Sequence, residues 1–303
     1  MVCRHGVDCT ESECLFSCSH WSAFAPPHLV IKNFINCMKK CYSENKSSVP
    51  CNADVTYGDS DRQKIDIWGD EENSKMAIAL FHGGYWQEGD RKLFTSMVKP
   101  LAENNITVAC IGYDLALKLP LTTLIDEAAK ALRFLERRWP SKRLFVGGHS
   151  AGAHLALSGL LSLGCESRIE SAILFSGIFQ LCDLPETYIG KAIGLTSIEA
   201  DKASIKDVER FKGSVRLIVG SLESPEFIAQ SERVTELFKR NHNRNVQLTI
   251  ISGEDHFSLI ENLGDRDSLQ MKELLSAFDQ RESRCSESIL SGYGRRGNSR
   301  TNV

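Results

Sequence analysis

From residue 63 onward, short apolar segments alternate with longer segments that are apolar on one face only. Most of the short segments are continuously apolar, which is typical of strands in a parallel sheet whose two faces are both covered. This pattern predicts strands over residues 63–69, 76–84, 106–114, 143–150, 171–179, 214–221 and 246–254.

The segments between these strands fit amphipathic helices. In residues 121–139, apolar side chains recur at i, i+3, i+4 and i+7, and Pro140 ends the helix. Another helix begins at Ser224, whose hydroxyl suits the N-cap, with Pro225 at the first helical position. The alternation of strand and helix predicts an α/β fold with a mostly parallel, doubly wound sheet.

The chain has 303 residues, 42% of them hydrophobic and 25% charged, as expected for a globular protein with a full core. Residues 63–282 contain no internal repeat or linker, so we predict a single α/β domain over 51–282. Residues 1–50 lack clear periodicity, apart from a helix near 29–42, and are predicted to be a partly ordered, cysteine-rich leader. The small, polar tail over 283–303 is predicted to be disordered.

The formal net charge is −3 and the isoelectric point is about 6.3, which favours neither nucleic acid nor an acidic membrane as a partner. No apolar run approaches the ~20 residues of a membrane helix, and the first residues lack the apolar core of a signal peptide. We therefore expect a cytoplasmic protein that binds no nucleic acid and no membrane. A homodimer is left open.

Eleven cysteines are present, and they concentrate near the N-terminus. Their odd number and the missing signal peptide argue against a secreted disulfide framework. Cys14, Cys18 and His20 are candidate metal ligands, but the segment has no CxxC pair. We predict reduced thiols, with no metal and no cofactor. Residues 1–20 and 284–303 are expected to be dispensable for the chemistry.

The candidate nucleophile is Ser150, in the sequence Gly148-His149-Ser150-Ala151-Gly152 between a predicted strand and an apolar helix. In this setting G-x-S-x-G forms a nucleophile elbow, a sharp turn that exposes the serine hydroxyl above the sheet. The backbone N–H of Ala151, at the start of the helix, then points to where an oxyanion would form. The alternative is a serine that only caps its helix.

A nucleophilic serine needs a base and an orienting carboxylate, which follow it in this fold in the order acid, then histidine. Of the two histidines far downstream, His242 lies in a polar linker, whereas His256 directly follows the last predicted strand. Glu223 follows the strand over 214–221 and is the candidate acid, although it also suits the first turn of a helix. Asp255 is too close to His256 in the chain, and Asp183 lies one strand too early.

Residues 81–90, "FHGGYWQEGD", follow an early strand with two glycines and two aromatic residues. Glycine backbone can approach a ligand closely, and a loop of this kind supplies the second oxyanion donor in α/β hydrolases. We expect Gly83 and Gly84, together with Ala151, to form the oxyanion hole. Tyr85 and Trp86 are expected to line the substrate pocket, with core packing as the alternative for Trp86.

These motifs also carry a family resemblance. The chain resembles the kynurenine formamidase (arylformamidase) family of α/β hydrolases over about residues 55–280, in its HGGxW motif (His82 to Trp86) and in the elbow. Further similar segments are "GYDLA" at 112–116, "SPEF" at 224–227 and "DHFSLIENL" at 255–263. The resemblance implies a triad of Ser150, Glu223 and His256, although the family usually has Asp at the position of Glu223.

The resemblance therefore predicts an α/β-hydrolase fold and a metal-free serine hydrolase. Its substrate would be a small aromatic N-formyl compound, N-formyl-L-kynurenine, which it would convert to L-kynurenine and formate in tryptophan catabolism. One alternative is a general carboxylesterase, which uses the same catalytic groups on small acyl or aryl esters. The other is a catalytically inactive α/β hydrolase that serves as a ligand receptor.

Overall fold

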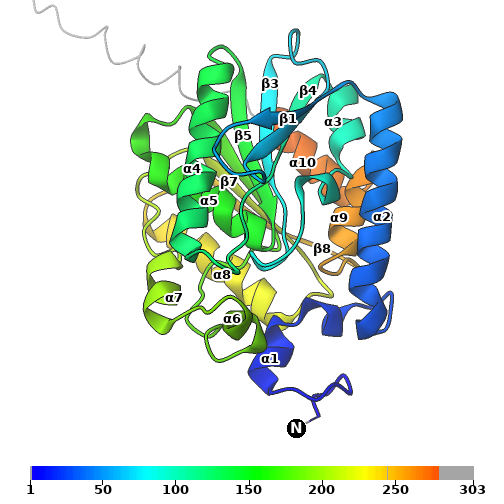
Figure 1. Cartoon of the computed structure of the whole chain (residues 1–303), viewed down its shortest axis with the longest axis vertical. Coiled ribbons are helices and arrows are strands. Elements are labelled where there is room, and N and C mark those ends of the chain that lie inside the picture. The colour runs from blue at the N-terminus through cyan, green and yellow to red at the C-terminus, as the bar shows by residue number, and fades with distance from the viewer. Residues whose placement is uncertain (1, 244, 280–303) are drawn as a thin grey trace, which may run out of the picture.

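The computed structural model of the protein describes residues 2–243 and 245–279, and its centre is a single large sheet (Figure 1). The tail predicted over 283–303 lies outside the described residues. The strands are β1 (Cys51–Thr56), β2 (Lys64–Trp68), β3 (Met76–Phe81), β4 (Ile106–Ile111), β5 (Arg143–His149), β6 (Ile169–Phe175), β7 (Ser214–Gly220) and β8 (Val246–Ile251).

The sheet has the strand order β1-β2-β4-β3-β5-β6-β7-β8. The pairs β1–β2 and β2–β4 are antiparallel, and the other neighbours run parallel. The predicted α/β-hydrolase architecture is therefore confirmed. The sequence pattern misses β1, because this edge strand is polar and mostly exposed and so lacks the apolar run of the central strands.

Helices cover both faces of the sheet (Figure 1). Alternate residues of a strand point to opposite faces, so in β3 Ala77 and Ala79 pack against one helical layer, while Ile78 and Leu80 pack against the other. The first layer contains α4 (Leu121–Arg138), α5 (Ala151–Leu163), α6 (Tyr188–Ala192), α7 (Ser197–Ala203) and α8 (Pro225–Arg240). The second contains α2 (Pro27–Ser48), α3 (Val98–Glu103), α9 (Ser258–Glu261) and α10 (Leu269–Asp279).

The N-terminal residues are built onto this domain. Helix α1 (Glu11–Phe16) lies beside α8 at one end of the molecule and leads into the 3₁₀ turn η1 (Cys18–Trp21) (Figure 1). Phe16 is 3% exposed and belongs to the first core layer, and Met38 of α2 is fully buried in the second. None of the helices in the described residues combines the length and apolar character needed to cross a bilayer.

Parallel strands place their carboxyl ends along one edge of the sheet, where ligands bind in open α/β folds. The loops after β3, β5, β7 and β8 carry Gly83, Ser150, Glu223 and His256 respectively. The topology thus gathers residues that are far apart in the sequence at a single edge. The remaining short 3₁₀ turns are η2 (Arg91–Leu93), η3 (Gly164–Glu166) and η4 (Asn262–Gly264).

Candidate active site

Ser150 lies in a sharp turn between β5 and α5. Its backbone has φ 56° and ψ −121°, a conformation that is costly for a residue with a side chain, and its N–H donates to the Phe175 carbonyl at 2.9 Å. The flanking glycines permit the turn: a Cβ on Gly152 would lie 2.1 Å from the Phe81 carbonyl oxygen, and one on Gly148 would lie 2.3 Å from the Gly152 carbonyl oxygen. This geometry is that of a nucleophile elbow.

His256 and Glu223 form a buried pair. His256 Nδ1 lies 2.9 Å from Glu223 Oε2, and the two side chains are 5% and 0% exposed. The second Glu223 oxygen accepts a hydrogen bond from the Ser176 hydroxyl, so both carboxylate oxygens have a partner. This arrangement fixes the ring with Nδ1 toward the acid and leaves Nε2 for the cavity that Ser150 also lines. The structure therefore places Glu223 in contact with His256 and places His256 and Ser150 on the same cavity, as the predicted triad requires.

The alternative acids are placed elsewhere. Asp255 Oδ1 accepts the backbone N–H groups of Phe257 and Ser258, and Oδ2 accepts the hydroxyl of Ser22 at 2.6 Å. These bonds commit Asp255 to holding the turn before α9. Asp183 is exposed in a separate surface depression. Neither carboxylate is available to the His256 ring.

The protonation of His256 is set by opposing effects. Burial lowers the pKa of His256, but the neighbouring Cys18 thiol and the Glu223 carboxylate raise it, and the net pKa lies well above the ordinary value. We attribute the rise mainly to Glu223, because its Oε2 atom is in direct contact with His256 Nδ1 at 2.9 Å. His149, whose ring centroid is 4.4 Å from that of His256, has its pKa depressed by burial and stays neutral.

The glycine loop after β3 lies against the elbow. Gly84 has φ +109°, and a Cβ there would lie 2.3 Å from the Glu88 carbonyl oxygen, so only glycine fits. A Cβ on Gly83 would come within 3.2 Å of Ser150 Cβ, which shows how closely this backbone approaches the serine. Ala151 begins α5 directly after Ser150. Gly83, Gly84 and Ser150 line the same cavity, and the oxyanion hole formed by Gly83, Gly84 and Ala151 stays a prediction.

The remaining HGGxW residues have different positions. The His82 ring stacks on Tyr113 at a centroid distance of 4.2 Å, and burial lowers the pKa of His82 to about 4, so it is a neutral support for the loop. Tyr85 lines the cavity, as predicted. Trp86 does not: it is fully buried and packs edge-on against His154 at 5.2 Å. For Trp86 the structure thus favours the core-packing alternative over a place in the cavity wall.

Comparison with known proteins places the chain in a family. Residues 78–256 match a family model described as the α/β-hydrolase fold. The chain belongs to the α/β-hydrolase fold family. It is 28% identical to kynurenine formamidase of Danio rerio over 280 residues, which cover 88% of this chain and 94% of that protein. Kynurenine formamidase of Salmo salar is also 28% identical, over 85% of this chain and 92% of its own length.

Solved structures support the same assignment of the fold. Esterase B from Lactobacillus rhamnosis superposes with a TM-score of 0.65 at 20% identity, covering 83% of this chain and 95% of that protein. The resemblance to kynurenine formamidases that the motifs suggested is thus confirmed over most of the chain, and the hydrolase fold is confirmed independently.

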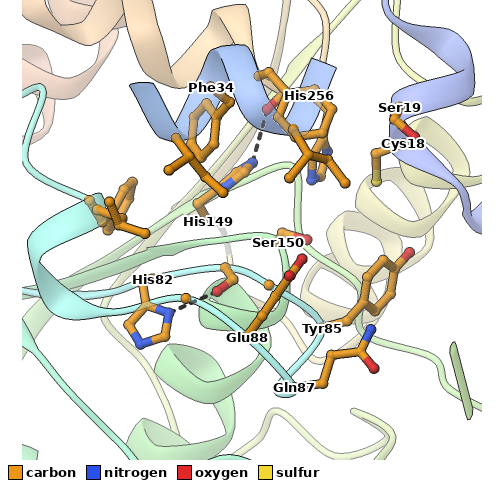
Figure 2. Close-up of a pocket in the computed structure, with 18 of the residues that line it drawn as sticks. Cys18, Ser19, Phe34, His82, Tyr85, Gln87, Glu88, His149, Ser150 and His256 are labelled. Carbon is orange, nitrogen blue, oxygen red and sulfur yellow. Dashed lines mark hydrogen bonds between the residues drawn. The ribbon is translucent and has the colours of Figure 1, made fainter. Parts of the chain in front are cut away.

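In this α/β hydrolase the cavity above Ser150 has a volume of about 200 Å³, and the sequence patterns do not reveal most of its wall. Figure 2 shows Cys18 and Ser19 reaching the cavity from the N-terminal segment, on the side of Tyr85 and His256. Gln87 and Glu88 contribute polar side chains to the lining. Apolar side chains from several elements complete the wall: Ile31, Phe34, Phe94, Ile189 and Phe257.

The N-terminal contribution is tied down by long-range hydrogen bonds. Tyr85 Oη donates to the Phe16 carbonyl at 2.6 Å, and the hydroxyls of Ser17 and Tyr188 are 2.9 Å apart. Such contacts leave no local signature, because they join residues that are 69 and 171 positions apart. A structural role in the site for residues 16–19 therefore becomes visible only in the folded chain.

Proposed function

We propose that this protein is a serine hydrolase that removes the formyl group from N-formyl-L-kynurenine, giving L-kynurenine and formate in tryptophan catabolism. The observation that carries the proposal is a nucleophile elbow facing an HGGYW loop, in a chain similar along most of its length to kynurenine formamidases. It is an arylformamidase, which hydrolyses a linear amide C–N bond.

The first half of the reaction transfers the formyl group to the enzyme. His256 Nε2 takes the proton of Ser150 Oγ, and the oxygen attacks the formyl carbon. The backbone N–H groups of Gly83, Gly84 and Ala151 stabilise the oxyanion, and each such donor is worth about 2.7–4 kcal/mol on the barrier. Glu223, held by Ser176, stabilises the imidazolium. His256 then gives its proton to the leaving aniline nitrogen, and the C–N bond breaks.

The second half restores the serine. Water, deprotonated by His256, attacks the formyl ester on Ser150, and the collapse of the tetrahedral intermediate returns the proton to Oγ and releases formate. A formyl group is the smallest acyl group, so the closely approaching Gly83 backbone leaves enough room for it. The apolar wall around Phe34 and Phe257 is suited to the aryl ring of the substrate.

The decisive test compares two substrates with wild type and Ser150→Ala. Wild type should hydrolyse N-formyl-L-kynurenine with a far higher kcat/KM than p-nitrophenyl acetate, and kynurenine and formate should appear in equal amounts. Ser150→Ala should remain folded and lose turnover, because deletion of such a nucleophile costs roughly 10⁶-fold. Retention of more than about a hundredth of the activity would exclude the covalent mechanism.

The two alternatives give other outcomes. A general carboxylesterase would prefer the ester, and an inactive receptor would bind kynurenine-like ligands without turnover and leave Ser150 unlabelled by a fluorophosphonate. The cytoplasmic location and the homodimer remain predictions. Subcellular fractionation and light scattering of the full chain test them.

A further inference from the structure

Four metal-binding side chains from the first twenty residues converge at the N-terminal end of the molecule. One ligand atom of each of Cys3, His5, Cys14 and His20 lies within 4.8 Å of the corresponding atoms of the other three. Within residues 2–243 and 245–279, it is these side chains that form a cluster of His, Cys, Asp or Glu able to hold a metal ion. Two thiols and two imidazoles are the donor set of a structural Cys₂His₂ zinc site.

The separations match what a tetrahedral ion needs. With Zn–S near 2.3 Å and Zn–N near 2.0–2.1 Å, the donor atoms of a tetrahedron are about 3.3–3.8 Å apart. His5 Nδ1 and Cys14 Sγ are 3.3 Å apart. The four ligand atoms now lie within 4.8 Å of one another. Side-chain movements on the order of 1 Å would bring them to the distances that a tetrahedral zinc ion requires.

The backbone holds the two halves of the cluster in place. A tight turn, in which Cys3 N–H donates to Val7 and Gly6 N–H donates to Cys3, brings Cys3 and His5 to the same side. Gly6 has φ +77°, a conformation that glycine adopts without strain.

The other half begins with a capping box at Thr10, which starts the helix that carries Cys14. Trp21 Nε1 then donates to the Cys14 carbonyl at 2.9 Å and keeps His20 next to that helix. The backbone that carries Cys3 and His5 and the backbone that carries Cys14 and His20 are therefore both ordered by hydrogen bonds.

His20 adds an independent observation. Its Nδ1 atom is buried and has no hydrogen-bond partner among the described residues, and an unsatisfied buried polar atom costs about 1–3 kcal/mol. Coordination at this nitrogen would satisfy it. Arg4 contacts His5 Nε2 at 3.4 Å, a long contact that metal binding through Nδ1 would break because Nε2 then carries the proton.

We propose that Cys3, His5, Cys14 and His20 bind one structural zinc ion. Binding releases the two thiol protons, and two thiolates with two neutral imidazoles balance the charge of Zn²⁺ without any redox step. The sequence pattern grouped Cys18 with Cys14 and His20, but in the fold Cys18 turns instead to the cavity above Ser150. The true set is spaced C-x-H-x₈-C-x₅-H, which no CxxC search would find.

The location gives the ion a role. Cys14 and His20 flank Phe16 and Cys18, the residues through which the N-terminal segment meets Tyr85 and lines the substrate cavity. The ion would hold this wall in place and would take no part in bond breaking. Its loss is expected to expose the segment to proteolysis and to raise KM, with a smaller effect on kcat.

The test is the metal content of the full-length protein purified under reducing conditions. Elemental analysis should find about one zinc per chain, and apoprotein given Co²⁺ should develop the visible and thiolate charge-transfer bands of tetrahedral cobalt. Cys14→Ser and His20→Gln should each lower zinc to below about a fifth of the wild-type content. The matched controls Cys37→Ser and Cys165→Ser should keep it.

Cys9 lines the same surface cavity as Cys3 and Cys14 and is the competing thiol, so Cys9→Ser should also retain the metal. Three results would overturn the proposal: a zinc-free protein whose apo form yields no tetrahedral cobalt spectrum, equal zinc loss in the control variants, or a Cys3–Cys14 disulfide in the reduced preparation. Cobalt binding by wild type needs no variant, so misfolding of Cys14→Ser would not obscure the answer.

Discussion

Replacing Glu223 with Gln removes one charge and almost nothing else. The carboxylate is fully buried, with Oε2 2.9 Å from His256 Nδ1 and Oε1 bonded to the Ser176 hydroxyl. The Gln amide has the same shape, and its NH₂ can face Ser176, because a hydroxyl accepts as well as donates. The amide oxygen then still faces His256 and keeps the ring in its orientation. The variant therefore isolates the charge from the geometry.

The expected loss follows from what the charge does in the transition state. Where an amide forces the wrong imidazole tautomer, a serine protease loses about 10⁴-fold in kcat. Ser176 lets the introduced amide preserve the tautomer of His256, so only the charge-assisted hydrogen bond is weakened, which is worth about 1.5–3 kcal/mol or roughly 10- to 150-fold. We expect a fall of about 10²-fold in Glu223→Gln. Adding Ser176→Ala should deepen the loss toward about 10⁴-fold.

The dependence of kcat/KM on pH should also change in Glu223→Gln. Glu223 raises the pKa of His256, and the reaction needs neutral His256, so wild-type kcat/KM is lost as pH falls through that raised pKa. Removing the carboxylate lowers the pKa. The acid limb of Glu223→Gln should therefore move to lower pH, while its plateau is reduced. A purely structural role for Glu223 would lower the plateau and leave the limb where it is.

The assay is kynurenine release from N-formyl-L-kynurenine between about pH 5 and 9, with circular dichroism for each variant. Glu226→Gln is the matched control, since Glu226 lies in the first turn of α8 and bonds to Arg233 outside the cavity. The activity of Glu223→Asp should lie between that of wild type and that of Glu223→Gln, because the aspartate side chain is one methylene too short to reach His256 in the same way. Near-full activity of Glu223→Gln, with loss in Asp183→Asn or Asp255→Asn, would refute the assignment of the acid.

Three further predictions concern the cavity wall. Glu88→Gln removes a carboxylate that lines the cavity and is suited to the substrate ammonium, and should raise KM for N-formyl-L-kynurenine about two- to fivefold, but not for p-nitrophenyl acetate. Tyr85→Phe breaks the hydrogen bond to the Phe16 carbonyl and should cost about two- to tenfold in kcat/KM, mostly through KM. Deletion of residues 2–20 should lower kcat/KM at least about tenfold, since it removes Cys18 and Ser19 from the wall; unchanged kinetics would restore the view that the leader is dispensable.

The sequence predicts the central strands well because their burial leaves a continuous apolar pattern in the sequence itself. Strands buried on both faces must be continuously apolar, and the pattern places β3, β4, β5 and β7 within a few residues of their observed bounds. The elbow is local only in part: a Cβ on Gly148 would meet the nearby Gly152 carbonyl, whereas one on Gly152 would meet the Phe81 carbonyl of β3. Motifs of this kind can be read from a single chain.

The cavity wall could not be read in this way, because it depends on tertiary contacts. Trp86 and Tyr85 are adjacent and both aromatic, yet one packs against His154 and the other faces the cavity. Nothing in the two residue types decides which does which. Ser176 lies on an apolar strand end and has no motif, although it holds the Glu223 carboxylate.

The division between these two parts of the site bears on how the enzyme selects its substrate. The elbow, the base and the acid stand on the strand ends of the sheet, and this arrangement serves esterases and formamidases alike. What distinguishes one hydrolase from another is the wall that the substrate meets above the serine. Here Cys18 and Ser19 contribute to that wall, and the segment that carries them is held by hydrogen bonds between Phe16 and Tyr85 and between Ser17 and Tyr188. Substrate selection should therefore respond to changes in the N-terminal segment that leave the reactivity of Ser150 toward a fluorophosphonate unchanged, and that separation is measurable.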